Sequence, residues 1–182
     1  MKVTPTEIPE VLLIEPIVHG DGRGFFLETW RAPRYRQAGI EFSFVQDNHS
    51  RSVAGTLRGL HYQVEQPQGK LVSVVTGTIY DVAVDLRESS PTFGRWVRAL
   101  LSEENHHQLW IPPGFAHGFY VLSASADVTY KCTVEYAAEH DRCIRWDDHE
   151  LAIIWPLING GAPLLSTRDA AGVAFRDADR YP

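Results

Sequence analysis

The sequence has few cysteines and no long hydrophobic run. Its 182 residues include only two cysteines, Cys132 and Cys143, with no CxxC spacing, which argues against a disulfide scaffold or a zinc finger. No apolar stretch reaches the roughly 18 residues that a membrane-spanning helix needs. The N-terminal residues lack the apolar core of a signal peptide, so we expect a cytoplasmic protein that does not associate with membranes.

Positive charge is also scarce. Lysine and arginine total 17 against 23 acidic residues, a formal net charge of −6, which argues against nucleic acid as a partner because long nucleic acids require a basic face. A small anionic ligand is still compatible, since a few converging arginines can hold a diphosphate. The chain shows no repeat, low-complexity tract or linker, and we expect one domain over residues 1–182.

Short apolar runs at regular spacing predict an all-β fold. The run Leu71–Val75 precedes Ile79–Leu86, and the three residues around Gly77 between them suit a hairpin. One short helix is expected over Pro33–Ala38, ended by Gly39. Many short strands and few helices indicate an antiparallel sandwich or small barrel, such as a jelly roll. Further strands are expected at Val11–Ile14, Trp96–Leu101, Gln108–Ile111, Phe119–Leu122 and Val128–Val134.

Two segments carry side chains suited to catalysis. His61 lies within Arg58–Gln63, and Lys70 opens the strand that follows. A histidine at the mouth of a β-barrel can act as a base near neutral pH, and a buried lysine can stabilise an enolate. Taken singly, such a histidine is more often structural and such a lysine is usually solvated. His117 follows the tight turn Pro112–Gly114.

A histidine before one hairpin and a Pro-x-Gly-x-x-His turn together look like a cupin jelly roll. Many cupins bind a metal through two histidines separated by one residue, a carboxylate and a third histidine. Here Gln63 stands at the second histidine position, and Lys70 lies where a carboxylate ligand is expected. A cation there repels a divalent metal, so we expect no metal site.

A series of ordered motifs resembles the dTDP-4-dehydrorhamnose 3,5-epimerase family. The resemblance runs from about Glu15 to Asp169, nearly the whole chain, and implies a cupin-type jelly roll, a homodimer, a dTDP-sugar substrate and no cofactor. The motifs are Asp21–Phe26, Gln46–Ser50, Leu57–Gln63, Gly69–Val72, Asp81–Arg87, Ser90–Gly94, Pro113–Phe119, Tyr130–Lys131 and Trp155–Pro156.

The resemblance also implies a role for each matched residue. His61 matches the family's general base, Asp169 the carboxylate that orients it, and Tyr130 the acid on the opposite face of the sugar. Lys70 matches the residue that stabilises the enolate oxygen. Tyr136 matches the aromatic ring that stacks on thymine. The other matched substrate-binding positions are Arg23, Phe26, Glu28, Gln46, Asn48, Arg58, His117, Asp141 and Arg168.

Two of these positions depart from the family, which often has Glu at Asp141 and Lys at Arg168. Both changes keep the charge and bear on nucleotide preference more than on the reaction. The implied reaction inverts C3 and C5 of dTDP-4-dehydro-6-deoxy-D-glucose. The alternatives are a 3-epimerase or 3,4-ketoisomerase on the same sugar, a metal-dependent cupin oxygenase, or a non-catalytic sugar-binding cupin.

Overall fold

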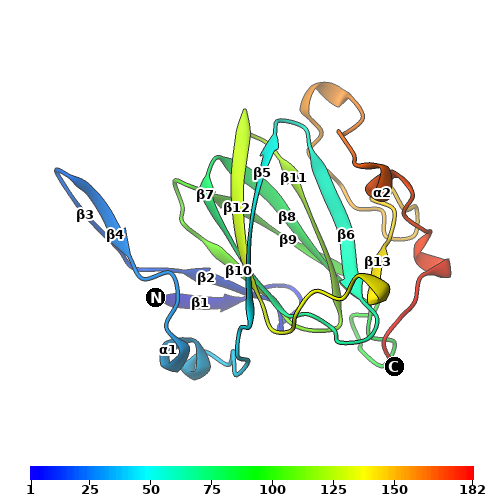
Figure 1. Ribbon diagram of the computed structural model, residues 1–182, viewed down its shortest axis with the longest axis horizontal. Coiled ribbons are helices and arrows are strands. Elements are labelled where there is room, and N and C mark those ends of the chain that lie inside the picture. Colours follow the sequence, from blue (N-terminus) through cyan, green and yellow to red (C-terminus); the bar gives the residue numbers. More distant parts are fainter.

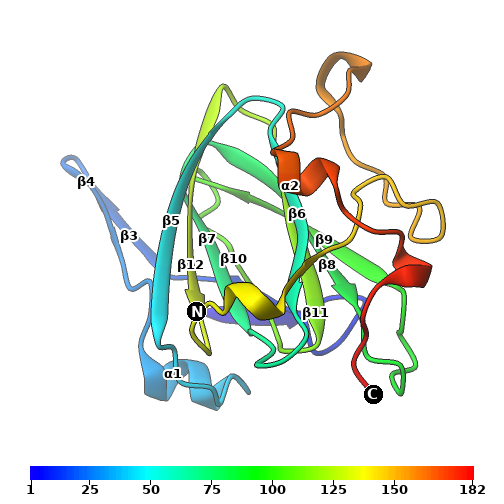
Figure 2. The same ribbon diagram turned by 45° about the vertical axis from the view of Figure 1, so that its right-hand side comes forward.

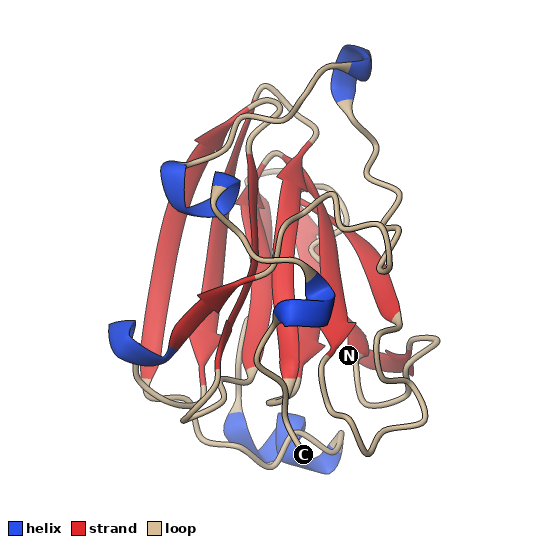
Figure 3. Ribbon diagram, turned by 90° about the vertical axis from the view of Figure 1, so that its right-hand side faces the viewer, coloured by secondary structure: helices blue, strands red, loops and turns tan.

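Two antiparallel sheets face each other and form the body of the protein (Figures 1 and 3). The computed structural model describes residues 1–182, except for the side chain of Asn159. The larger sheet has the order β1-β2-β10-β7-β12-β5. Its strands are β1 (Lys2–Pro5), β2 (Leu12–Glu15), β5 (Gln46–Val53), β7 (Lys70–Thr76), β10 (Gln108–Ile111) and β12 (Ser125–Cys132).

The smaller sheet has the order β13-β6-β11-β8-β9. It is the more deeply buried layer, since every residue of β11 and the last five of β8 are buried. The C-terminal segment, including α2, covers its outer face beside β6 (Figure 2). Its strands are β6 (Leu57–Gln63), β8 (Thr78–Asp85), β9 (Trp96–Ser102), β11 (Phe115–Val121) and β13 (Asp141–Cys143).

The core follows from alternation along these strands. Val72 and Val74 of β7 point inward and pack against Ile79 and Ala83 of β8 in one buried cluster between the sheets. Near one end of the sandwich, polar side chains replace the apolar ones, and a cavity opens between the two sheets. The expected all-β, cupin-type jelly roll is confirmed, and this arrangement places the candidate site inside the barrel.

The remaining elements lie outside the sandwich. β3 (Val18–Asp21) and β4 (Gly24–Leu27) form a hairpin, here called the arm, that projects away from the body (Figure 1). The expected helix is present as α1, shifted by one residue. The helices are α1 (Ala32–Gln37), η1 (Ala138–His140), η2 (Ile158–Gly160), α2 (Thr167–Ala170) and η3 (Phe175–Asp177). Within the described part of the chain, none is long and apolar enough to cross a membrane.

The hairpin expected around Gly77 is wrong. β7 pairs with β10 and β12, whereas β8 pairs with β11 and β9, so the chain changes sheets at this turn. Gly77 has φ +80°, and its N–H donates to Glu103 Oε1 at 3.0 Å. A Cβ there would lie 2.1 Å from the carbonyl oxygen of Ser125. The turn is therefore fixed by packing against distant loops.

Candidate active site

His61 and Asp169 form a close pair, although 108 positions separate them in the sequence. His61 lies on β6, and its Nε2 is 2.6 Å from Asp169 Oδ1. Asp169 is the third residue of α2, where it forms a capping box with Ser166. The Gly59 N–H also donates to its Oδ1 at 3.1 Å. These contacts fix the carboxylate beside the imidazole.

The electrostatics keep this carboxylate charged. Burial raises the pKa of the Asp169 carboxyl, but the contacts from His61, Ser166 and the Gly59 amide outweigh burial and hold that pKa far below its usual value. An ionised carboxylate at one ring nitrogen fixes the tautomer and stabilises an imidazolium. The other ring nitrogen of His61 is left to exchange a proton with a ligand.

A cavity of about 330 Å³ lies next to this pair, between the two sheets. Ten of the residues expected from the sequence line it. His61, Arg58 and His117 come from β6 and β11 of one sheet, whereas Lys70, Tyr130 and Asn48 come from β7, β12 and β5 of the other. The other four expected residues are Gln46, Tyr136, Asp141 and Arg168, which lie along the same cavity.

Lys70 is the buried cation of the cavity. It is 8% exposed and lies opposite Cys132 in the β7–β12 register. Burial lowers the pKa of its ammonium group, while the nearby Cys132, Asp141 and Asp81 act in the opposite direction. A desolvated cation of this kind interacts strongly with negative charge that develops on a ligand.

Tyr130 provides a neutral proton donor on the opposite wall from His61. It lies on β12, two residues from the position opposite Lys70. Burial raises the pKa of its phenol, with a smaller contribution from Cys132. The hydroxyl therefore keeps its proton at neutral pH and can donate it.

His117 belongs to a second histidine–carboxylate pair. It is the cross-strand neighbour of His61, and its Nε2 contacts Asp81 Oδ1. Asp81 is fully buried on β8, and its second oxygen has no hydrogen-bond partner among the described residues. Sequence reasoning gave Asp81 no role of its own. The sequence does carry a signal for Asp81. This carboxylate lies in the mostly apolar run of β8, two residues from the core residues Ile79 and Ala83.

The mouth of the cavity carries a polar network. The Tyr136 hydroxyl donates to Asp141 Oδ2 at 2.8 Å, and Arg168 forms an ion pair with the same carboxylate. Gln46 Oε1 accepts the Tyr136 N–H at 2.8 Å, and Gln46 Nε2 donates to Asn48 Oδ1 at 2.9 Å. Tyr136 is half exposed, so one aromatic ring is presented at the rim beside a half-exposed cation.

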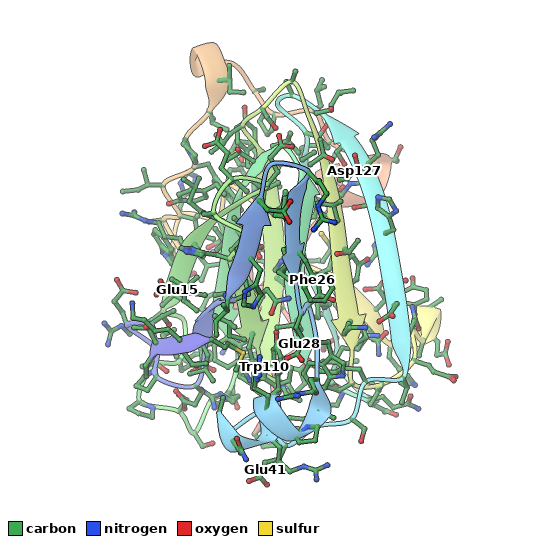
Figure 4. The ribbon with its side chains drawn as sticks, turned by 90° about the vertical axis from the view of Figure 1, so that its left-hand side faces the viewer. Glu15, Phe26, Glu28, Glu41, Trp110 and Asp127 are labelled. Atoms are coloured by element: carbon green, nitrogen blue, oxygen red, sulfur yellow. The ribbon has the colours of Figure 1, made fainter. Side chains whose placement is uncertain are left out.

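Three of the expected substrate-binding residues lie outside this cavity. Arg23 is on the tip of the arm, with a side chain 91% exposed and paired only with Asp21 among the described residues. Phe26 is 71% exposed on β4. Glu28 lies at the base of the arm, where Arg34 Nη1 is 2.9 Å from its Oε1. Figure 4 shows Phe26 and Glu28 on the arm side of the molecule, in front of the larger sheet.

Comparison with known proteins gives a consistent result. The model of the dTDP-4-dehydrorhamnose 3,5-epimerase family matches residues 5–177. A dTDP-4-dehydrorhamnose 3,5-epimerase of Pseudomonas aeruginosa is 58% identical over 183 residues, covering 100% of both chains. The structure of dTDP-6-deoxy-D-glucose-3,5-epimerase from Legionella pneumophila, in complex with dTDP-4-keto-L-rhamnose, is 53% identical, with a TM-score of 0.95, and the match covers 100% of this chain and 98% of that one.

A neighbour with a narrower activity shares the same architecture. The 3'-monoepimerase of Streptomyces bikiniensis, in complex with dTDP-quinovose, is 36% identical with a TM-score of 0.86, and the match covers 93% of this chain and 86% of that one. The fold alone therefore does not separate single from double epimerisation. The family model and the 58% relative, which both span nearly all of the sequence, agree with the resemblance of its motifs. The chain belongs to the dTDP-4-dehydrorhamnose 3,5-epimerase family.

Proposed function

We propose that the enzyme inverts C3 and C5 of dTDP-4-dehydro-6-deoxy-D-glucose, with His61 as base, Tyr130 as acid and Lys70 as the cation at the C4 oxygen. The observation that carries the proposal is the position of these groups around one cavity. His61 belongs to one sheet, and Tyr130 and Lys70 belong to the other. A sugar ring between the sheets therefore meets the base on one face and the acid on the opposite face.

The chemistry requires these three groups. The C4 ketone acidifies the protons on C3 and C5, and removal of either proton places negative charge on the C4 oxygen. His61 accepts the proton, and Asp169 stabilises the imidazolium that forms. Lys70 stabilises the enolate, and Tyr130 returns a proton from the other side, which inverts the carbon.

The nucleotide would bind at the mouth of the cavity. Tyr136 offers a ring for stacking on thymine, and Arg58 and Arg168 offer guanidinium groups for the diphosphate. Asp141 already holds Arg168 and Tyr136 together, so the shorter acid still reaches both partners. Gln46 and Asn48 present amides between the sugar and nucleotide ends of the cavity.

We further propose a homodimer in which each arm reaches the cavity of the other subunit. A two-stranded hairpin is marginally stable by itself in water, yet this arm exposes Phe25 at 62% and Phe26 at 71%. Arg23 and Phe26 cannot serve the cavity from their observed positions on the arm. Supply of Arg23 of the partner subunit would complete the anion site.

The decisive experiment is incubation with dTDP-4-keto-6-deoxyglucose in deuterated water, followed by product NMR. We expect deuterium at both C3 and C5 and a product of L configuration. His61→Ala should lose exchange at both carbons, because one base serves both. Wild-type exchange in His61→Ala would contradict the assignment of the base.

The same spectra test the second candidate function, a 3-epimerase. Its specific support is the shared fold of the 3'-monoepimerase neighbour. Deuterium and inversion confined to C3 would establish that activity. A product whose carbonyl group lies at C3 rather than C4 would instead indicate a ketoisomerase.

A further inference from the structure

A cysteine lies beside the candidate base. Cys143 is on β13, directly opposite His61 in the β13–β6 register. Its Sγ, a ring nitrogen of His61 and a carboxylate oxygen of Asp169 all lie within 4.8 Å of one another. The mechanism proposed above uses the histidine and the carboxylate but has no use for the thiol.

The backbone holds the three donors in place. Leu60 and Ile144 exchange two backbone hydrogen bonds, of 3.0 and 2.9 Å, next to the pair formed by His61 and Cys143. The Val173 N–H donates to the carbonyl oxygen of Cys143 at 3.0 Å. The Asp169 carboxylate is held separately by Ser166 and Gly59. The side chains of His61, Cys143 and Asp169 are therefore held close together by the fold itself.

These donors match the preferences of zinc. Zn²⁺ binds thiolate sulfur, imidazole nitrogen and carboxylate oxygen, and tetrahedral geometry separates its ligand atoms by about 3.5 Å. The three donor atoms lie within 4.8 Å of one another, and His61 Nε2 and Asp169 Oδ1, now 2.6 Å apart, would have to separate to bind the same ion. A thiolate and a carboxylate together cancel the charge of a divalent ion. The fourth coordination position is left for water, next to the cavity that His61 lines.

The protonated thiol is a poor nucleophile, which argues against covalent chemistry at Cys143. Burial raises the pKa of Cys143 to about 11, and the neighbouring Asp169 adds to the increase. A metal that binds here displaces the thiol proton, so its binding is accompanied by proton release. In addition, His61 Nε2 has no well-aligned hydrogen-bond partner among the described residues, although Asp169 is close.

We propose that His61, Cys143 and Asp169 form an inhibitory site for Zn²⁺, in which the metal binds the ring nitrogen that faces Asp169. The other ring nitrogen of the neutral imidazole then carries the proton and cannot accept one from the substrate. The inhibition rests on the proposed role of His61, whereas the metal site itself does not. Cys143 is thus a determinant of metal sensitivity and takes no part in the reaction. Chelation should leave activity unchanged or raise it.

The test compares the wild type with Cys143→Ser, and Cys132→Ser serves as a matched control for the loss of a thiol. We expect Zn²⁺ to inhibit the wild type and Cys132→Ser, and EDTA to restore both. Cys143→Ser should keep its basal activity and need at least about tenfold more Zn²⁺ for half-inhibition, since the thiolate is the strongest of the three ligands. Equal sensitivity of Cys143→Ser and the wild type would overturn the proposal.

A direct binding measurement separates the site from the mechanism. Co²⁺ replaces Zn²⁺ and gives a near-ultraviolet absorption band when it binds a thiolate. This band should be present in the wild type and Cys132→Ser and absent in Cys143→Ser. The band does not depend on turnover, so it would persist if His61 proved not to be the base. Its absence from the wild type would rule out the site.

Discussion

At the scale of single residues, the cavity separates the two halves of an inversion. His61 and Tyr130 lie on different sheets, so removal and return of a proton depend on different side chains. Tyr130→Phe removes one hydroxyl and little volume. We expect this variant to incorporate solvent deuterium, at C3 at least, while giving much less product of L configuration.

The reason is that the enolate still forms when only the acid is lost. The charged His61 can then return a proton to the face from which it came. A time course of deuterium at C3 and C5, together with product stereochemistry, measures both events. Wild-type rate and stereochemistry in Tyr130→Phe would transfer the acid role to another group or to water.

The carboxylate behind the base gives a second prediction. Asp169→Asn keeps the shape of the side chain and its acceptor for the Gly59 N–H, but removes the charge that stabilises imidazolium. We expect kcat to fall by about 10² to 10⁴, with a small change in KM. Steady-state kinetics measure this split. Asp177→Asn is the control, because it changes an exposed carboxylate of the same C-terminal segment, and it should match the wild type. An unchanged kcat in Asp169→Asn would remove Asp169 from the mechanism.

At the scale of elements, one glycine lets β6 pass close to β11. Gly59 has φ +126°, and a Cβ there would lie 2.5 Å from Gly118 Cα and 2.8 Å from the His117 carbonyl oxygen. Backbone cannot move away as a flexible side chain can. We expect Gly59→Ala to lower the free energy of unfolding by about 2 kcal/mol or more.

Urea unfolding of Gly59→Ala and Gly22→Ala tests this constraint. Gly22 lies at the tip of the arm, where an added methyl group would meet no atom within 4 Å and where φ is not positive. Its replacement should change stability by no more than about 0.5 kcal/mol. Equal stability of the two variants would mean that β6 and β11 can separate at little cost.

The elements also show where sequence reasoning succeeded and failed. Gln108–Ile111 was predicted to the residue, and β7, β8 and β9 to within one residue at each end, because their apolar runs are buried. β5 was missed because polar side chains occupy both of its faces. Its inward positions, among them Gln46 and Asn48, line the cavity. The strand was therefore hidden by the same residues that make it functional.

Pairing of strands was harder to predict than their existence. A three-residue turn with a central glycine is compatible with a hairpin, but also with a change of sheet. The partners of β8 are β9 and β11, and pairing with β11 depends on residues about 35 positions further along the chain. In the same way, spacing alone could not bring His61 to Asp169. Only the family resemblance linked them, and Asp81 and Cys143 were given no role.

At the scale of the whole molecule, stability in acid depends on a buried carboxylate that does not line the cavity. Asp85 is fully buried at the end of β8 and accepts hydrogen bonds from Arg87, Ser90 and Thr92. Burial raises the pKa of this carboxyl, but these donors outweigh it and lower the pKa from 3.8 to about 2. The charged form is therefore favoured in the folded state.

The sign of the pH dependence follows from this shift. A depressed folded-state pKa stabilises the protein above the unfolded value, and that contribution, about 2 kcal/mol, is lost as the pH falls from about 4 to about 2. We expect Asp85→Asn to be less stable than the wild type at neutral pH and the difference to shrink in acid. Urea titrations at several pH values measure it. Asp147→Asn removes an exposed carboxylate that pairs with Arg145, an arginine two residues before it, and should cost no more than about 1 kcal/mol. A pH-independent difference for Asp85→Asn would contradict the linkage.

The arm raises the question of whether one subunit contains a complete site. Arg23 lies on the exposed tip of the arm, whereas His61 lies inside the barrel. If each arm serves the partner's cavity, a dimer of His61→Ala and Arg23→Ala subunits contains one intact site. That site has the base of the Arg23→Ala subunit and the arm of the His61→Ala subunit.

Co-expression of the two variants with different tags therefore tests assembly and function together. Each variant alone should be weakly active or inactive, and random pairing should restore about one quarter of the wild-type activity, because half of the dimers are mixed and each mixed dimer has one intact site. Dimers purified through both tags should reach about one half. If the arm serves its own subunit, no mixed dimer contains an intact site, and the activity would stay at the level of the separate variants. A monomeric wild type in sedimentation would reject the exchange outright.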